Sequence, residues 1–381
     1  MKTKVAVLST AAMAVSMLQL FVLGALGPVL VAGSGLARWQ LGVLVAAGFG
    51  VAALLSLPVG ALVDRIGPKR GLVWLFALSA VSLGVLAVAR SPWWVAVGVA
   101  LGGVPQALAN PATNKLVLAA VEPAARGSVT GWKQSGVQLG AFVAGVPLAG
   151  AAAVVDWRWG VAVLAVLCLV GAAVAARLPV GVPPRKAGGP VGGVGDRVAV
   201  LAGFSLALGF GLASVNTYFA LYGVDRLGLA APVAAWLIAV MGVLGIAGRV
   251  VWSGAAGRAD DPAAVLPWLA LGAAGSVGLV AAAEWWPWSV WLGAVGIGVF
   301  AVSGNAVSMV AVMRAVPQRA AGRAAAVASA GFFGGFALGP PVTGLVVQHA
   351  GYGWLWSAVG SAFLVSAAVA VRVTRRTAVA V

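Results

Sequence analysis

Long apolar stretches separated by short polar turns run along the whole chain. Twelve of them stand out, at residues 6–32, 40–62, 71–89, 93–118, 127–152, 159–177, 198–222, 232–253, 264–283, 288–313, 323–348 and 353–372. A hydrocarbon core of roughly 30 Å is crossed by about 20 helical residues, so these stretches are long enough to span a membrane. Lipid offers backbone groups no hydrogen-bond partner, and strand-like alternation is absent, so each stretch is predicted to be a helix. The pattern predicts an all-α membrane protein with twelve transmembrane helices.

Composition and charge agree with this prediction. Hydrophobic residues make up 62% of the chain and the mean hydropathy is +1.05, far above the range of soluble domains. The net charge of +16 would indicate nucleic-acid binding in a soluble protein. With the N-terminus inside, however, the outer turns hold only Arg38, Arg90, Arg158 and Arg226 of the 24 lysines and arginines. This asymmetry predicts that both termini are cytoplasmic and that nucleic acid is not a partner.

A dense charged turn interrupts the apolar pattern between residues 60 and 70, where the chain reads GALVDRIGPKR. Its order of residues resembles the loop between helices 2 and 3 of the major facilitator superfamily, G-x-x-x-D-[RK]-x-G-x-[RK]-[RK]. The resemblance implies a membrane transporter in which this loop is a conformational latch that stabilises the outward-facing state. The latch residues would be Gly60, Asp64, Arg65, Gly67 and Arg70. The alternative is that these residues only enforce topology and a tight turn.

An internal repeat of 194 or 195 residues supports the resemblance. The shift brings Gly60 onto Gly254 and Trp159 onto Trp354. The second copy of the charged turn, GAAGRADDP, is degraded, because Arg258 stands where an aspartate is expected. Arg249, just before it in GRVVWSG, is similar to the family's helix 8 ending, and we assign it a latch role.

The resemblance predicts two pseudo-symmetric six-helix bundles, the major facilitator fold. Residues 1–177 would form the N-terminal bundle and residues 198–381 the C-terminal bundle. Residues 178–197 are rich in glycine and proline and are predicted to be a cytoplasmic linker. The substrate site of such a fold lies between the bundles, near the midplane of the membrane.

Glycines recur in the fifth predicted helix, at Gly127, Gly136, Gly140 and Gly145. Their spacing follows the family's antiporter motif, but Ala141 and Ala144 depart from it. Small residues four apart allow close helix contact without any exporter function, so helix packing is the favoured interpretation.

Polar residues inside membrane helices are costly, and by default they mark a transport pathway. The candidate cavity residues are Gln19, Gln106, Asn110, Asn114, Lys133, Gln134, Gln138, Asn216, Tyr218, Tyr222, Asn305 and Ser308. Gln106, Asn110 and Asn114 follow one another at helical spacing and form one stripe. For the asparagines and glutamines, hydrogen bonding between helices without ligand contact is the alternative.

Lys133 is the most informative of these residues. Its counterpart in the repeat is Ala328, so the architecture does not require a cation at this position. It could extend to the cytoplasmic interface, as buried lysines near helix ends do. The sharper hypothesis is an electropositive cavity that receives an anionic substrate. The eight carboxylates all lie in predicted turns or at helix ends, which disfavours proton-coupled export of cationic drugs.

These features predict a secondary active transporter that works by alternating access in a bacterial inner membrane. We expect a small anion or polar solute as substrate, carried by a symporter or antiporter, with a proton as a candidate coupling ion. An efflux antiporter for drugs or metabolites is the alternative; a membrane-embedded enzyme or a non-transporting sensor is a remote one. We expect no catalytic residues, no cofactor and no metal, and a monomer whose partners are the small-molecule substrate and membrane lipid.

Overall fold

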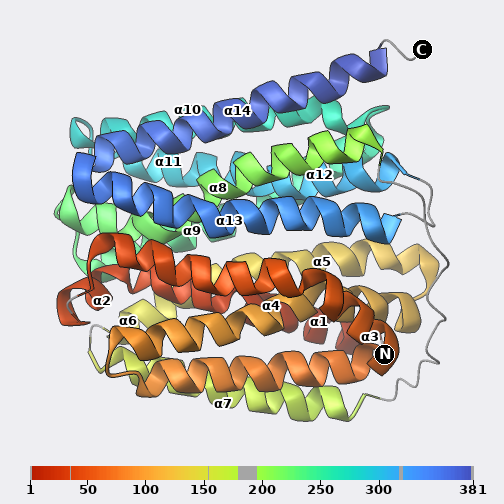
Figure 1. Ribbon diagram of the computed structural model, residues 1–381, viewed down its shortest axis with the longest axis horizontal. Coiled ribbons are helices and arrows are strands. Elements are labelled where there is room, and N and C mark those ends of the chain that lie inside the picture. The colour runs from red at the N-terminus through yellow and green to blue at the C-terminus, as the bar shows by residue number, and fades with distance from the viewer. Residues whose placement is uncertain (1, 35, 153, 179–194, 317–320, 379–381) are drawn as a thin grey trace. The chain divides into compact units, whose positions relative to one another are not determined.

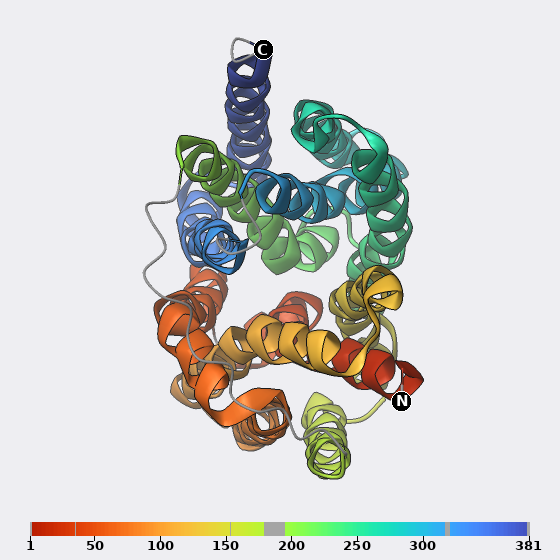
Figure 2. The same ribbon diagram turned by 90° about the vertical axis from the view of Figure 1, so that its right-hand side faces the viewer.

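The computed structural model describes residues 2–34, 36–152, 154–178, 195–316 and 321–378. Within these ranges the secondary structure is helical, without strands. Twelve of the helical segments are long and apolar enough to cross a membrane, as the sequence predicted. Figure 2 shows these helices end-on. The predicted linker falls almost entirely on residues outside the described ranges, and the division into halves at that linker stays a prediction.

Contacts divide the chain into two units, which are described separately. Unit 1 takes in residues 1–36, 47–187 and 231–239, and unit 2 the remainder. The helices of unit 1 are α1 (Lys2–Ala25), α2 (Gly27–Ser34), most of α3 (Arg38–Val88), α4 (Pro92–Ala120), α5 (Pro123–Val143), the π-helical turn η1 (Ala144–Leu148), α6 (Ala149–Ala152) and α7 (Trp157–Ala176). The start of α9 also belongs to this unit.

Unit 2 contains residues 37–46, 188–230 and 240–381, and so includes the first residues of α3. Its helices are α8 (Asp196–Asp225), most of α9 (Ala231–Arg258), the 3-10 turn η2 (Pro262–Val265), α10 (Leu266–Ala281), the 3-10 turn η3 (Ala282–Glu284), α11 (Ser289–Ile297), the π-helical turn η4 (Gly298–Val302), α12 (Ser303–Arg314), α13 (Ala321–Ala350) and α14 (Tyr352–Ala378).

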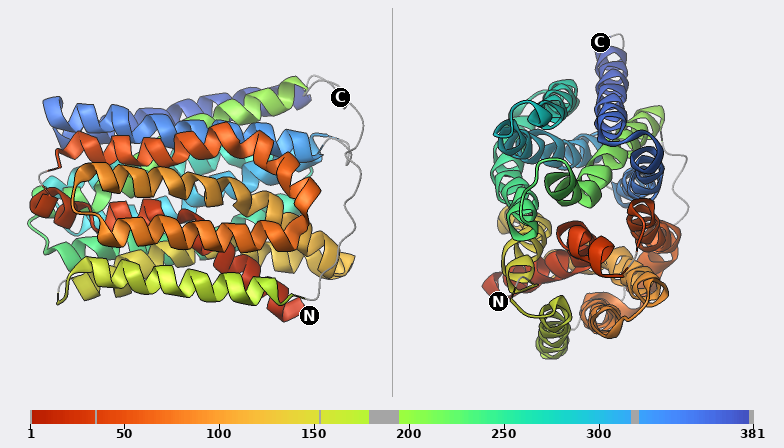
Figure 3. Two further views of the ribbon diagram at one scale, coloured as in Figure 1. Left: turned by 60° about the horizontal axis from the view of Figure 1, so that its bottom comes forward. Right: turned by 90° about the vertical axis from the view of Figure 1, so that its left-hand side faces the viewer.

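The charged turn of the sequence is a one-residue break inside α3. Gly67 adopts φ 83° and ψ 164°, a backbone conformation that residues with a side chain rarely adopt, and Pro68 follows it. The chain doubles back there, so α3 supplies two spanning segments that run in opposite directions (Figure 3). Glycine at this position is therefore required by geometry.

Two predicted helices are broken where proline interrupts the hydrogen-bond ladder. The stretch predicted as 127–152 begins earlier, at Pro123, and passes through η1, which contains Pro147. Proline has no N–H to donate to the preceding turn, and the wider π turn accommodates the missing bond. The first predicted helix, 6–32, likewise starts at Lys2 and is divided after Ala25, just before Pro28.

Close backbone contacts at glycines hold the central helix pair of each unit. In unit 1, a side chain at Gly136 would lie 2.0 Å from the Thr10 carbonyl oxygen on α1. In unit 2, α13 and α8 lie side by side (Figure 1), and a side chain at Gly331 would lie 2.4 Å from the Ala202 carbonyl oxygen. Gly136 and Gly331 are the pair that the sequence repeat brings together. The repeat therefore extends to the packing of these helices.

The remaining glycines of the fifth helix pack in the same way. A side chain at Gly140 would lie 2.8 Å from the Ala14 carbonyl oxygen on α1. One at Gly145 would lie 2.7 Å from the Ala235 carbonyl oxygen at the start of α9. Helix packing accounts for both positions without any exporter role. Gly127 lies in the part of α5 for which only the backbone is described.

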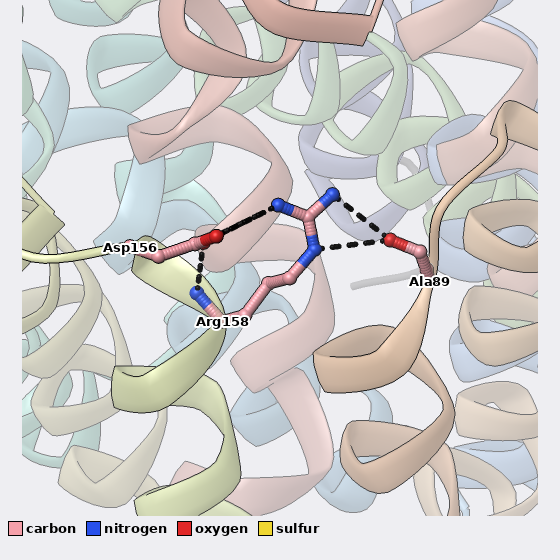
Figure 4. A network of polar contacts seen from close by, with 3 residues as sticks. All are labelled: Ala89, Asp156 and Arg158. Carbon is pink, nitrogen blue, oxygen red and sulfur yellow. Dashed lines mark hydrogen bonds and ion pairs between the residues drawn. The ribbon is translucent and has the colours of Figure 1, made fainter.

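A polar contact ties the start of α7 to the end of α3 (Figure 4). The Arg158 guanidinium donates through Nε and Nη2 to the Ala89 carbonyl oxygen, at 3.1 and 3.0 Å. Asp156 caps α7 by accepting the Arg158 backbone N–H at 3.0 Å, and it also pairs with the guanidinium at 3.1 Å. The backbone hydrogen bond, followed by the interactions with the side chain of Arg158, lowers the pKa of Asp156.

Substitution at adjacent glycines of α13 tests the packing of unit 2. Gly335→Ala would place a carbon 2.1 Å from the Leu206 carbonyl oxygen, and the overpacking should lower the free energy of unfolding by about 1–3 kcal/mol. Gly334→Ala is the matched control, because its nearest contact is at 4.0 Å, and it should gain roughly 0.5–1 kcal/mol from reduced backbone entropy. Thermal unfolding in detergent measures both. Equal effects of the two variants would contradict the packing argument.

The Asp156 contact should depend on pH. Since its pKa is lowered, its stabilisation is complete above the ordinary value of 3.8 and is lost as the pH falls through the folded-state pKa. Asp156→Asn keeps a capping side chain but removes the charge. At neutral pH the wild type should be more stable than this variant by about 0.2–1 kcal/mol, a range typical of an exposed pair. Thermal unfolding should show the difference disappearing below pH 3.8, and a difference independent of pH would refute this account.

Candidate functional site

A buried lysine with two amide partners forms the candidate site of unit 1. Lys133 lies ten residues after Pro123, the first residue of α5, and its side chain is 0% exposed. Its Nζ donates to Asn114 Oδ1 at 2.5 Å and to Asn110 Oδ1 at 3.4 Å, both on α4. The lysine therefore points into the protein and toward the polar stripe of α4 instead of extending to an interface.

The positive charge of Lys133 is solvated but not neutralised. Both of its partners are neutral amide oxygens. Within the described residues, Nζ has no carboxylate within ion-pair distance. Burial of a charge without a counter-charge is costly, so this group is poised to attract an anion.

The stripe on α4 changes from exposed to buried along its length. Asn114 is exposed and Asn110 is partly exposed. Gln106, one turn further, is 7% exposed, and its Oε1 is buried with no hydrogen-bond partner in the described structure. The stripe thus leads from an accessible end to a closed one, and Lys133 meets it at the accessible end.

The other candidates in unit 1 are less closely connected to this cluster. Gln19 on α1 donates to Ser82 Oγ at 3.2 Å, and Ser82 donates to the Gly98 carbonyl oxygen, so this glutamine links helices. Gln138 is buried and its Oε1 has no partner among the described residues, while Gln134 is partly exposed. Among the described residues, no hydrogen bond is seen between Gln19 or Gln138 and the amides that hold Lys133.

The candidates in unit 2 bond mainly to the backbone. Tyr218 OH donates to the Pro340 carbonyl oxygen at 2.9 Å, and Tyr222 OH to that of Val280 at 3.1 Å. Within single helices, the Asn216 amide donates to the Leu212 carbonyl oxygen, and Ser308 donates to that of the partly exposed Asn305. The two tyrosine bonds join α8 to neighbouring helices and do not define a ligand site.

The structure gives a specific hydrogen bond for one of the proposed latch residues, Arg249, and the surroundings of several others. Arg65 and Arg70 are exposed, and Gly60 has open space beside it. The side chain of Asp64 lies outside the described residues. In unit 2, Arg249 is buried and donates to the Val302 carbonyl oxygen of η4 at 3.4 Å. The latch role of these residues stays a prediction.

A polar cluster in unit 2 was missed by the sequence argument. Arg38, at the start of α3, pairs with Asp225 through Nε and Oδ2 at 2.7 Å. Tyr352 OH donates to the same carboxylate oxygen at 2.8 Å. A side chain at Gly42 would lie 2.1 Å from the Pro340 carbonyl oxygen, so the first turns of α3 sit close to α13. The sequence feature that could have indicated this cluster is Asp225, an isolated acid at the end of a membrane helix.

Comparisons with known proteins give a family and a fold. The sequence model of the Major Facilitator Superfamily matches residues 9–326. No curated protein matches the chain. Among solved structures, a bacterial homolog of the human lysosomal transporter Spinster, inward-facing and occupied, is similar with a TM-score of 0.77 and 16% identity over 98% of this chain and 97% of that one. Its inward-facing, unoccupied structure has a TM-score of 0.69 and 16% identity, over 98% and 95% of the two chains.

Removal of the buried charge should not destabilise the ligand-free protein. Lys133→Met keeps the length of the side chain and removes an ammonium whose partners are two amides. The free energy of unfolding should stay the same or rise by up to about 1–4 kcal/mol, as when buried ionic groups are replaced by apolar ones. Lys4→Met, at an exposed lysine of α1, is the control and should change it by less than about 0.5 kcal/mol. Strong destabilisation by Lys133→Met would mean that the charge is structural.

Proposed function

The chain belongs to the Major Facilitator Superfamily, and we propose that it is a secondary active transporter whose substrate is a small anion or a polar solute. It is a multi-pass membrane transporter and not an enzyme. We place it in a bacterial inner membrane as a monomer with both termini in the cytoplasm. The charge asymmetry of its turns supports this orientation.

The observation that carries the substrate proposal is Lys133, a fully buried ammonium held by two neutral amides. An anion about 4 Å from Nζ would gain on the order of 4 kcal/mol of Coulomb energy at an effective dielectric constant of 20. A cation at the same place would be repelled by a similar amount. The site therefore favours an anion over a cationic drug.

The position of the carboxylates supports the same choice. Asp225 is paired with Arg38, Asp261 with Arg197 and Glu284 with Arg226. Each of these acids lies at the end of a helix or in a turn and not at its middle. An exporter that exchanges a proton for a cation commonly uses a carboxylate within the membrane. A proton can instead accompany a weak-acid substrate, and we propose this form of coupling.

Uptake into proteoliposomes tests the proposal. Phosphate, acetate, succinate and gluconate are offered one at a time, with and without an imposed proton gradient, to the wild type, Lys133→Met and Lys4→Met. We expect at least one of these anions to be taken up, and uptake to fall at least tenfold in Lys133→Met and not in Lys4→Met. A tenfold loss corresponds to about 1.4 kcal/mol, well within the Coulomb energy at stake. Stimulation by an inward proton gradient would support proton coupling.

The efflux alternative predicts a different result in the same vesicles. A lipophilic cation such as ethidium would be exchanged for protons, and Lys133→Met would leave this exchange intact or increase it. That outcome, together with the absence of Lys133-dependent anion uptake, would contradict the proposed substrate class.

A further inference from the structure

Gln106 carries a buried hydrogen-bond acceptor for which the described part of the chain offers no donor. Its side chain is 7% exposed, and no described group donates to its Oε1. An amide oxygen without a partner in a dry interior loses the hydrogen bonds that it makes with water. Most buried polar atoms are paired, and an exception of this kind calls for an explanation.

The position of Gln106 relative to Lys133 supplies one. Gln106 lies four residues before Asn110 on α4, which places the two on one face of the helix, roughly 6 Å apart along its axis. Asn110 is in turn 3.4 Å from Lys133 Nζ. Gln106 therefore lies one helical turn from Asn110 and two turns from Asn114, the two residues that hold the cation, on the same stripe and toward its closed end.

The two asparagines complete the pattern of donors. Each uses its Oδ1 to accept from Lys133, so its NH₂ group is turned to other partners. Among the described residues, none accepts from these NH₂ groups. The cluster thus offers one ammonium and two amide donors at its accessible end, and one bare acceptor at its buried end.

We propose that the substrate is an organic anion that carries a hydroxyl group or another hydrogen-bond donor one to two helical turns, roughly 6–12 Å, from its charged group. The anionic group binds Lys133 and the amides of Asn110 and Asn114. The distal donor binds Gln106 Oε1. This inference rests on the proposed function and narrows it, because inorganic anions and unsubstituted carboxylates leave Gln106 without a partner.

Binding of two matched anions to the purified protein tests the inference. The probes are 5-hydroxypentanoate and pentanoate, which have the same chain and differ in a terminal hydroxyl group. Calorimetry on the wild type should give a dissociation constant about tenfold lower for the hydroxylated anion, the typical effect of satisfying a buried acceptor. Lys133→Met should lose both anions.

Variants at position 106 identify the acceptor. Gln106→Met has nearly the shape of glutamine without its acceptor, and Gln106→Leu is a second apolar variant. Both should lose the preference and bind the two anions with equal affinity. Gln348→Leu, at an exposed glutamine of α13, is the control and should keep the tenfold preference.

The outcomes separate this inference from the proposed function. If both anions bind the wild type equally and depend on Lys133, the anion site stands and the role of Gln106 is wrong; a water molecule then satisfies its oxygen. If neither anion binds in a Lys133-dependent way while phosphate is transported, the organic-anion class is wrong. If no anion binds or is transported in a Lys133-dependent way, the proposed function fails with it.

Discussion

The close approach of helix backbones at glycine is the constraint on which the candidate site depends. Gly136 has no side chain to separate α5 from the Thr10 carbonyl oxygen on α1. Lys133 lies three residues earlier, on the same face of α5 as this contact. The packing of α5 against α1 positions the helix from which Lys133 reaches the amides of α4. A looser pair of helices would leave the lysine room to reach solvent, and the amides of α4 would lose their cation.

The sequence predicted the parts of the fold that depend on hydrophobic length and on local geometry. Twelve spans follow from the apolar stretches, and the break at Gly67 follows from the glycine and proline of the charged turn. The division of the fifth helix at Pro147 was not predicted. Neighbouring helices can satisfy the backbone groups that a proline leaves free, so a proline in a membrane helix does not by itself predict a break. The pair of Arg38 and Asp225 joins residues far apart in the chain, and only the fold brings them together.

The candidate cavity residues were harder to sort, because residue type does not reveal a partner. Tyr218 and Gln106 are both buried polar side chains on membrane helices. Tyr218 donates to the carbonyl oxygen of Pro340, far along the chain, whereas the Gln106 oxygen has no described donor. Backbone carbonyls are present at every residue, so sequence alone cannot say which of them will be within reach. The stripe of Gln106, Asn110 and Asn114 was predictable from helical spacing; its connection to Lys133 required the packing of α4 beside α5.

Among the described residues, Lys133 is the buried cation of unit 1 and Arg249 that of unit 2. Arg249 donates to the Val302 carbonyl oxygen at the end of the π-helical turn η4, a group fixed by the backbone. Lys133 is held by side-chain amides, which can rotate and rebind as a ligand enters. An ammonium bound to mobile amides on a partly exposed stripe suits exchange between protein and substrate. The sequence repeat supplies the frame of both units, and the proposed substrate site lies where the chain departs from the repeat, at Lys133, whose counterpart in the second unit is Ala328.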